Sequence, residues 1–195
     1  MLLTPGPTPV PEFVRKAMAD ITIHHRTEEF EAIFKNTREL LLELYGLPEV
    51  VMLASSGTGA MEACVTNLTH KKALTINSGK FGERFGKICA AFGIDYTEIK
   101  NEWNTPVSVE AVVEAIKADS SIDAVFIQIC ESAGGLRHPV EQIAAEIKKI
   151  NKDITIVADG ITAVGVEKID TTNLDAVVTG SQKALMLPPG LAMIG

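Results

Sequence analysis

A lysine near the end of the sequence has the surroundings of a reactive amine. Lys183 follows an apolar stretch at residues 176–179 and a Gly-Ser turn, and residues 184–186 after it are apolar. An amine among apolar neighbours loses hydration, which lowers its pKa and frees its lone pair to attack an aldehyde. The sequence therefore indicates a nucleophilic lysine, and the alternative is an ordinary solvated loop lysine.

A carboxylate has an equivalent place after another apolar run. Residues 154–158 read as a buried strand that ends at Asp159 and Gly160. Open α/β sheets bind ligands at the carboxyl ends of their strands, so Asp159 and Lys183 are expected at one edge of a sheet. The alternative is a turn aspartate that caps the segment from Ile161 onward.

A small polar loop suggests an anion site. The apolar run at residues 50–54 leads into Ser55-Ser56-Gly57-Thr58-Gly59 and then into a helix-like segment. Free N–H groups and the dipole at a helix start favour negative charge, and we expect glycines here to let a ligand approach the backbone. The loop lacks the nucleotide-binding glycine patterns, so a lone phosphate is favoured. A plain helix cap is the alternative.

The remaining pattern predicts the elements that position these groups. Short apolar runs alternate with amphipathic stretches, which predicts an α/β fold with a mostly parallel sheet and helices on both faces. The expected strands are 50–54, 73–77, 96–99, 124–129, 154–158, 176–179 and 191–194. The expected helices are 57–68, 81–92, 109–117 and 140–150, preceded by 12–19 and 28–44. Residues 4–9 contain three prolines and are expected to be extended.

Composition limits the function classes. The chain has 195 residues, 46% of them hydrophobic, and a net charge of −7, which argues against a nucleic-acid partner. No apolar run has the length of a membrane span and no signal peptide is evident, so no membrane partner is expected. Three widely spaced cysteines fit reduced thiols in the cytoplasm. The adjacent His24 and His25 lack a ligand pattern, so no metal site is predicted.

Several motifs together resemble one enzyme family. They are Pro5-Gly6-Pro7-Thr8, His25-Arg26-Thr27-x-Glu29-Phe30, the loop Ser55–Glu62, Glu131-Ser132-x-x-Gly135, and Gly180-Ser181-Gln182-Lys183-Ala184-Leu185 followed by Pro188-Pro189-Gly190. In this order, and over nearly the whole chain, they resemble the class V aminotransferases that depend on pyridoxal 5′-phosphate (PLP), specifically the alanine–glyoxylate and serine–pyruvate group. The resemblance implies the large domain of the aspartate aminotransferase-like fold, fold type I.

The resemblance also implies residue roles. Lys183 would form the Schiff base with PLP, and Asp159 would pair with the pyridine nitrogen and keep the ring an electron sink. Phe81 would stack on the ring, Ile161 would press on its opposite face, and Ser132 would donate to its phenolic oxygen. The phosphate would be held by Ser56, Gly57, Thr58 and Gln182. Phe81 and Ile161 could alternatively be ordinary core residues.

The implied function is transamination between a small amino acid, such as alanine, serine or aspartate, and a 2-oxo acid such as pyruvate or glyoxylate. A homodimer is implied, with residues 1–45 packing on the domain or the partner subunit and residues 46–195 as the PLP-binding domain. The family's small C-terminal domain would follow beyond residue 195. Three alternatives remain: a PLP-binding fragment that needs a partner chain, a PLP lyase on the same fold, and a nucleotide-binding domain.

Overall fold

The computed structural model describes residues 2–195. The helices are α1 (Glu12–Met18), α2 (Glu28–Tyr45), α3 (Gly57–Leu68), α4 (Gly82–Phe92), α5 (Val109–Ala118) and α6 (Val140–Ile150). The strands are β1 (Val51–Leu53), β2 (Lys72–Asn77), β3 (Tyr96–Lys100), β4 (Ile122–Gln128), β5 (Cys130–Glu131), β6 (Leu136–Arg137), β7 (Thr155–Asp159), β8 (Ala176–Gly180) and β9 (Ala192–Ile194). Each predicted helix and strand is present, with bounds that differ by two residues or fewer.

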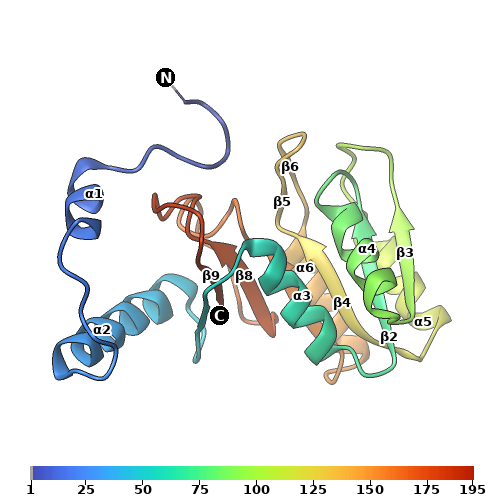
Figure 1. Ribbon diagram of the computed structural model, residues 1–195. Helices are drawn as coiled ribbons and strands as arrows, with labels where there is room; N and C mark the ends of the chain where they lie inside the picture. Colours follow the sequence, from blue (N-terminus) through green and yellow to red (C-terminus); the bar gives the residue numbers. More distant parts are fainter. Residues whose placement is uncertain (1) are drawn as a thin grey trace.

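A seven-stranded sheet forms the centre of the molecule, in the order β1-β9-β8-β7-β4-β2-β3 (Figure 1). The pairs from β8 through β7, β4 and β2 to β3 are parallel, whereas β9 is antiparallel to both β8 and β1. The sheet is therefore mostly parallel, which confirms the predicted fold class. Because β1 runs in the direction of β8, its carboxyl end lies at the same edge as those of β4, β7 and β8.

Helices cover both faces of this sheet. On one face, α3 and α4 pack through residues such as Met61 and Phe85 against Phe126 and Val178. On the other face, α5, α6 and the end of α2 share a core with the oppositely directed side chains of the same strands. A strand buried on both sides needs apolar residues at nearly every position, which explains the continuous apolar runs in the sequence.

One small element was not predicted. Strands β5 and β6 form an antiparallel ribbon in which Cys130 pairs with Arg137 and Glu131 with Leu136. Each strand has only two residues, too few for a periodic pattern to be visible. The ribbon follows β4 and carries Glu131 and Ser132 toward the carboxyl edge of the sheet (Figure 1).

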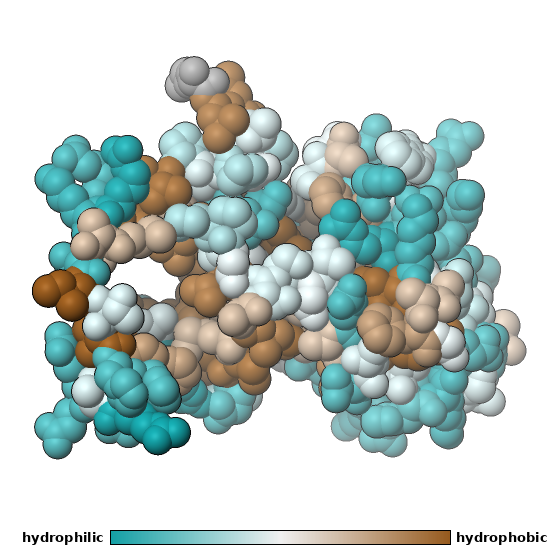
Figure 2. Space-filling view, viewed as in Figure 1, coloured by the Kyte–Doolittle hydropathy of each residue, from teal (hydrophilic) through white to brown (hydrophobic). Residues whose placement is uncertain are grey.

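The N-terminal part forms an arm beside the sheet. Helix α1 has no buried residue, and α2 contacts the core only near its end, through Leu41 and Tyr45. Figure 2 shows an open gap between the arm and the rest of the molecule. The prediction of an extended segment at residues 4–9 is wrong in part, because residues 4–7 bend and Thr4 Oγ1 donates to Pro7 O at 3.3 Å. In residues 2–195 no helix is long and apolar enough to cross a membrane.

Candidate active site

Lys183 lies just beyond the carboxyl end of β8, in a turn that its neighbours hold in place. Ser181 is buried, its Oγ donates to Pro188 O at 2.6 Å, and its carbonyl accepts from Leu187 N at 3.0 Å. The side chain of Lys183 is partly buried, and burial lowers its pKa, against the opposing effect of Asp159. A lowered pKa increases the fraction of neutral, nucleophilic amine, as the sequence suggested.

Asp159 is the last residue of β7 and is only 4% exposed. Its Oδ1 accepts a hydrogen bond from Ile161 N at 3.0 Å, the turn contact that was the alternative to a ligand role. Burial raises the pKa of Asp159 to about 6, the nearby Glu131 adds to the rise, and Arg84 and Lys183 oppose it. A buried carboxyl group whose pKa is raised in this way is typical of functional sites.

The two groups line the same cavity at the carboxyl edge of the sheet. Its walls are Phe81, Cys130, Ser132, Asp159, Ile161, Thr162 and Lys183. The residues come from the loops after β2, β4, β7 and β8, which is where an open parallel sheet gathers ligand contacts. Five of the nine predicted site residues therefore meet in one place.

Three of the four predicted phosphate residues, Ser56, Gly57 and Thr58, lie at the start of α3. Ser56 is the N-cap, and its Oγ accepts from Gly59 N at 3.3 Å, so the capping alternative also holds for this side chain. Within residues 2–195 the N–H groups of Gly57 and Thr58 have no acceptor. A Cβ on Gly57 would lie 2.4 Å from Ile161 Cδ1, so the absent side chain of this glycine admits Ile161, while its N–H stays free for a ligand.

Gln182 and the N-terminal segment enclose the lysine from another side. The Oε1 of Gln182 is buried and unpartnered within residues 2–195, so this oxygen is available to accept a hydrogen bond from a ligand. Thr8 N donates to Gln182 O at 3.0 Å, and Thr8 Oγ1 donates to Lys183 O at 2.9 Å. A Cβ on Gly6 would lie 2.8 Å from Lys183 Nζ, so this glycine permits the close approach.

Sequence reasoning missed what positions Phe81. The fully buried carboxylate of Glu131 accepts from Phe81 N at 2.9 Å, Gly82 N at 2.8 Å and Ala133 N at 3.2 Å, and it thereby caps α4. Gln128 Nε2 donates to Phe81 O at 2.9 Å. Phe81 itself provides no side-chain cap to α4, and this missing cap is the signal that an acceptor from elsewhere in the chain was needed.

Arg84 is a second residue that sequence reasoning missed. Its Nη1 donates to Thr58 Oγ1 at 2.9 Å, and its Cζ lies 4.9 Å from the centroid of the Phe81 ring. The available signal was a cation in the first turn of a helix, where the helix dipole favours anions.

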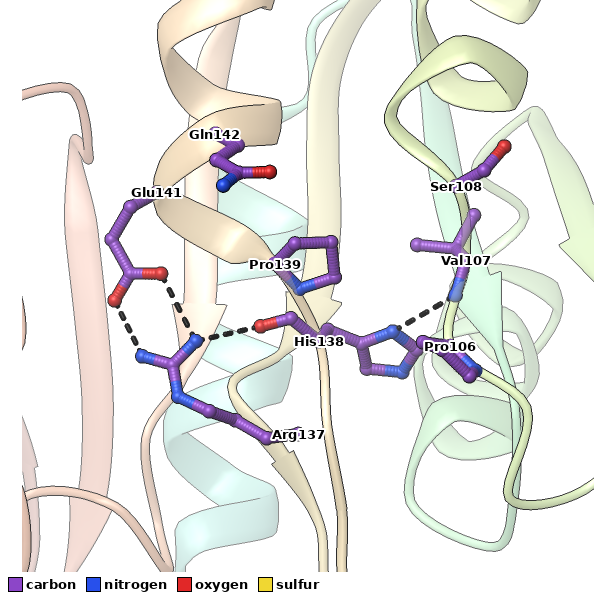
Figure 3. A pocket seen from close by; sticks show the side chains of 8 residues that line it. All are labelled: Pro106, Val107, Ser108, Arg137, His138, Pro139, Glu141 and Gln142. Atoms are coloured by element: carbon purple, nitrogen blue, oxygen red, sulfur yellow. Dashed lines mark hydrogen bonds and ion pairs between the residues drawn. The ribbon is translucent and has the colours of Figure 1, made fainter.

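A second, larger hollow lies around Arg137 and His138 (Figure 3). Most of its polar groups are paired with one another, but His138 Nε2 is buried and unpartnered within residues 2–195. Arg137 donates to both oxygens of Glu141 and also to Glu167, and His138 Nδ1 accepts from Val107 N at 3.2 Å. Because the cation of this hollow is already paired with two carboxylates, the size of the hollow alone does not make it the site of chemistry.

Comparisons with known proteins agree with this geometry. Residues 2–194 match the family model described as aminotransferase class-V. The chain belongs to the class-V aminotransferase family. Family membership confirms the predicted resemblance, and with it PLP as the cofactor.

The relatives are longer than this chain. It is 51% identical to an uncharacterized aminotransferase of Helicobacter pylori and 30% identical to an L-aspartate–glyoxylate aminotransferase of Paracoccus denitrificans, and in both cases it is fully covered. It spans 53% and 51% of their lengths, respectively. An aspartate aminotransferase of Thermus thermophilus superposes with a TM-score of 0.91 at 31% identity, covering 98% of this chain and 55% of that one. This likeness confirms the aspartate aminotransferase-like fold.

The residues present fit PLP. The aldehyde needs an amine, the pyridine nitrogen needs a buried carboxylate, and the phosphate needs unpaired donors. Lys183 and Asp159 line one cavity, and the free backbone N–H groups of Gly57 and Thr58 at the start of α3 supply unpaired donors.

Proposed function

We propose that the full-length protein catalyses transamination between a small amino acid and a 2-oxo acid, with Lys183 as the residue that binds PLP covalently. The observation that carries this proposal is the single cavity shared by Lys183 and Asp159, in which burial shifts the pKa of each group toward its neutral form. A neutral amine is matched to attack on an aldehyde, and a buried carboxylate, whose ionised form a nearby cation would stabilise, is matched to a protonated pyridine nitrogen.

The proposed binding roles follow from where each residue lies. Asp159 would accept from the protonated pyridine nitrogen, and the positive charge of that nitrogen would offset the burial that raises the pKa of Asp159. Phe81 and Ile161 would enclose the ring, and Ser132 would donate to the phenolic oxygen. The phosphate would be held by Ser56, Gly57, Thr58 and Gln182, since the start of α3 offers free N–H groups to an anion.

The chemistry divides between cofactor and protein. When bound, PLP supplies an electron sink for negative charge at the amino acid's Cα. Lys183 Nζ would take the Cα proton, and its lowered pKa favours the neutral amine that this step requires. Ile161, Phe81 and the Gly6–Thr8 segment would keep water from the reacting atoms.

The substrate proposal rests on similarity. One relative at 30% identity is named an L-aspartate–glyoxylate aminotransferase and another a serine–glyoxylate aminotransferase. We propose alanine, serine or aspartate as the amino donor and glyoxylate or pyruvate as the acceptor.

We also propose the assembly and location of the protein. Residues 1–45 would form an arm that packs on a second copy in a cytoplasmic homodimer, and residues 46–195 would form the PLP-binding domain. The exposed apolar side chains of the arm, including Phe13 and Ile21, support this assembly, and the three free cysteines support a reducing location.

An activity assay on the full-length protein tests the function. With PLP present, each of the three donors is offered with each acceptor, and formation of the new amino acid is followed. We expect turnover with at least one pair, and loss of at least about 10³-fold in Lys183→Ala. The matched control is Lys168→Ala, at an exposed lysine away from the cavity. Undiminished turnover in Lys183→Ala would exclude the proposal.

A further inference from the structure

Arg84 connects the two walls of the candidate cofactor site. It lies in the first turn of α4, yet its guanidinium donates to Thr58 Oγ1 at the start of α3 and lies 4.9 Å from the Phe81 ring centroid. The start of α3 is the proposed phosphate site, and Phe81 is the proposed ring wall. A single side chain thus contacts both.

Within residues 2–195 the guanidinium of Arg84 forms no ion pair. Arg38 and Arg137 each form an ion pair with a glutamate, whereas within residues 2–195 no carboxylate lies within 4.0 Å of Arg84. The side chain is partly buried, and a cation in the first turn of a helix also opposes the helix dipole. An anion bound beside the guanidinium would offset both features.

The hydrogen bonds around Arg84 leave donors free. A guanidinium has five N–H groups, and Thr58 is the one acceptor that residues 2–195 provide to Arg84. Because Thr58 Oγ1 accepts this bond, its hydroxyl hydrogen is directed elsewhere. Together with the free N–H groups of Gly57 and Thr58, these donors surround one end of α3. Such a set suits a phosphate dianion, which has only acceptors to offer.

The charge of Arg84 also acts on the reactive groups. It lowers the pKa of Lys183 and partly opposes the rise in the pKa of Asp159. Both effects favour a neutral Lys183 amine and an ionised Asp159 carboxylate, which are the protonation states that the proposed chemistry needs. This electrostatic reach agrees with the hydrogen bond and the ring contact in placing Arg84 at the edge of the cofactor site.

We propose that Arg84 is the side-chain cation that recognises the phosphate of the cofactor, and that it couples phosphate binding to the position of the Phe81 ring. This inference rests on the proposed function, because it takes the cavity to be the PLP site. It assigns Arg84 as a binding residue, with the cation over Phe81 stabilising the ring's orientation.

Two ligands that cannot react with Lys183 isolate the phosphate contribution. Pyridoxine 5′-phosphate and pyridoxine both lack the aldehyde, and they differ in the phosphate alone. Their dissociation constants are measured by calorimetry on the full-length protein for wild type, Arg84→Met, Arg84→Lys and Lys87→Met. Lys87→Met is the matched control, because it removes an exposed cation from the same helix.

In Arg84→Met we expect affinity for pyridoxine 5′-phosphate to fall about tenfold or more, with that for pyridoxine changing by less than about twofold. Arg84→Lys should lie between wild type and Arg84→Met, and Lys87→Met should match wild type. In a Thr58→Val background the effect of Arg84→Met should shrink, because the two groups act together. Equal weakening of both ligands, or none, would overturn the assignment.

The inference and the proposed function can fail separately. If PLP forms no covalent adduct with Lys183 but the phosphate-selective loss in Arg84→Met is seen, Arg84 still recognises a phosphate while the transamination proposal fails. If the adduct forms and Arg84→Met keeps the full affinity difference between the two ligands, the role of Arg84 is overturned while the proposed function stands.

Discussion

The cavity at Lys183 and the hollow around Arg137 contain similar residues in opposite states. Around Arg137, cation and carboxylates pair directly, and the pKa of Arg137 is raised by Glu141 and Glu167. At the cavity, burial lowers the pKa of Lys183 and raises that of Asp159, and the N–H donors at the start of α3 stay free. Since the larger hollow also contains an unpartnered atom, His138 Nε2, unsatisfied atoms alone do not mark a ligand site. Free donors beside a partly buried amine and a buried carboxylate, more than the size of a hollow, mark the place prepared for a ligand.

The largest expected effect on stability concerns the buried carboxylate beside the cavity. Glu131→Gln would place an amide NH₂ against backbone N–H donors, so the free energy of unfolding should fall by about 2–3 kcal/mol. The comparison variant is Glu141→Gln in the Arg137 hollow, where the partly exposed pair should cost less than about 1 kcal/mol. Urea unfolding measures the loss of unfolding free energy in both variants. Equal losses would contradict the distinction between the two regions.

The second prediction concerns pH and has opposite signs in the two regions. The pKa of Asp159 is raised from 3.8 to about 6 in the folded protein, so between these values the folded state binds more protons. Its contribution to stability therefore falls as pH rises through this window and stays low above it. Asp159→Asn, which retains an acceptor for Ile161 N, should raise the free energy of unfolding of the cofactor-free protein by about 2 kcal/mol at pH 8.

His138 has the opposite sign. Burial lowers its pKa from 6.5 to about 4, so in that window the unfolded state binds more protons and stability rises with pH. In His138→Asn, whose Oδ1 can replace Nδ1 as acceptor for Val107 N, this acid sensitivity should disappear. Denaturant titrations of wild type and of both variants at pH 5, 6.5 and 8 give the difference in unfolding free energy between wild type and each variant. If this difference changes with pH in the same direction for both variants, at least one of the two assignments is wrong.

The third prediction tests how closely the N-terminal segment confines the lysine. In Gly6→Ala the new Cβ would lie 2.4 Å from Lys183 Cδ, so either the lysine or the segment must move. The rate of PLP adduct formation, followed by absorbance, should fall about tenfold. Pro9→Ala, an exposed position in the same segment, is the control and should react at the parent rate. An unchanged rate in Gly6→Ala would show that the segment is free to move away.

The smallest effect is expected in the Arg137 hollow. Arg137→Met removes ion pairs at partly exposed side chains, so the loss of stability should be below about 1 kcal/mol, with affinity for PLP unchanged. Thermal unfolding and PLP titration measure the two quantities. Weaker PLP binding in this variant would show that Arg137 influences the cofactor site, which contradicts the separation of the two regions.

The sequence predicts local elements and the edge at which they meet. Apolar runs such as residues 154–158 identify buried strands, and parallel order then places Asp159 and Lys183 together. Contacts between distant segments leave a weaker trace: a helix start without a capping side chain, as at Phe81, shows that an acceptor is needed but not which residue supplies it. Glu131 caps a helix about 50 residues earlier in the chain, and Ile161 fills the space that Gly57 leaves, so both depend on the packed sheet. The bend at residues 4–7 was hidden by the extended preference of residues before proline.

The most direct test of the central claim is the identity of the residue that PLP modifies. The full-length protein is incubated with PLP, reduced with borohydride, digested and analysed by mass spectrometry. The account predicts a single reduced pyridoxyl group on Lys183, and its loss in Lys183→Ala. Modification spread over exposed lysines, with Lys183 unmodified, would contradict the account.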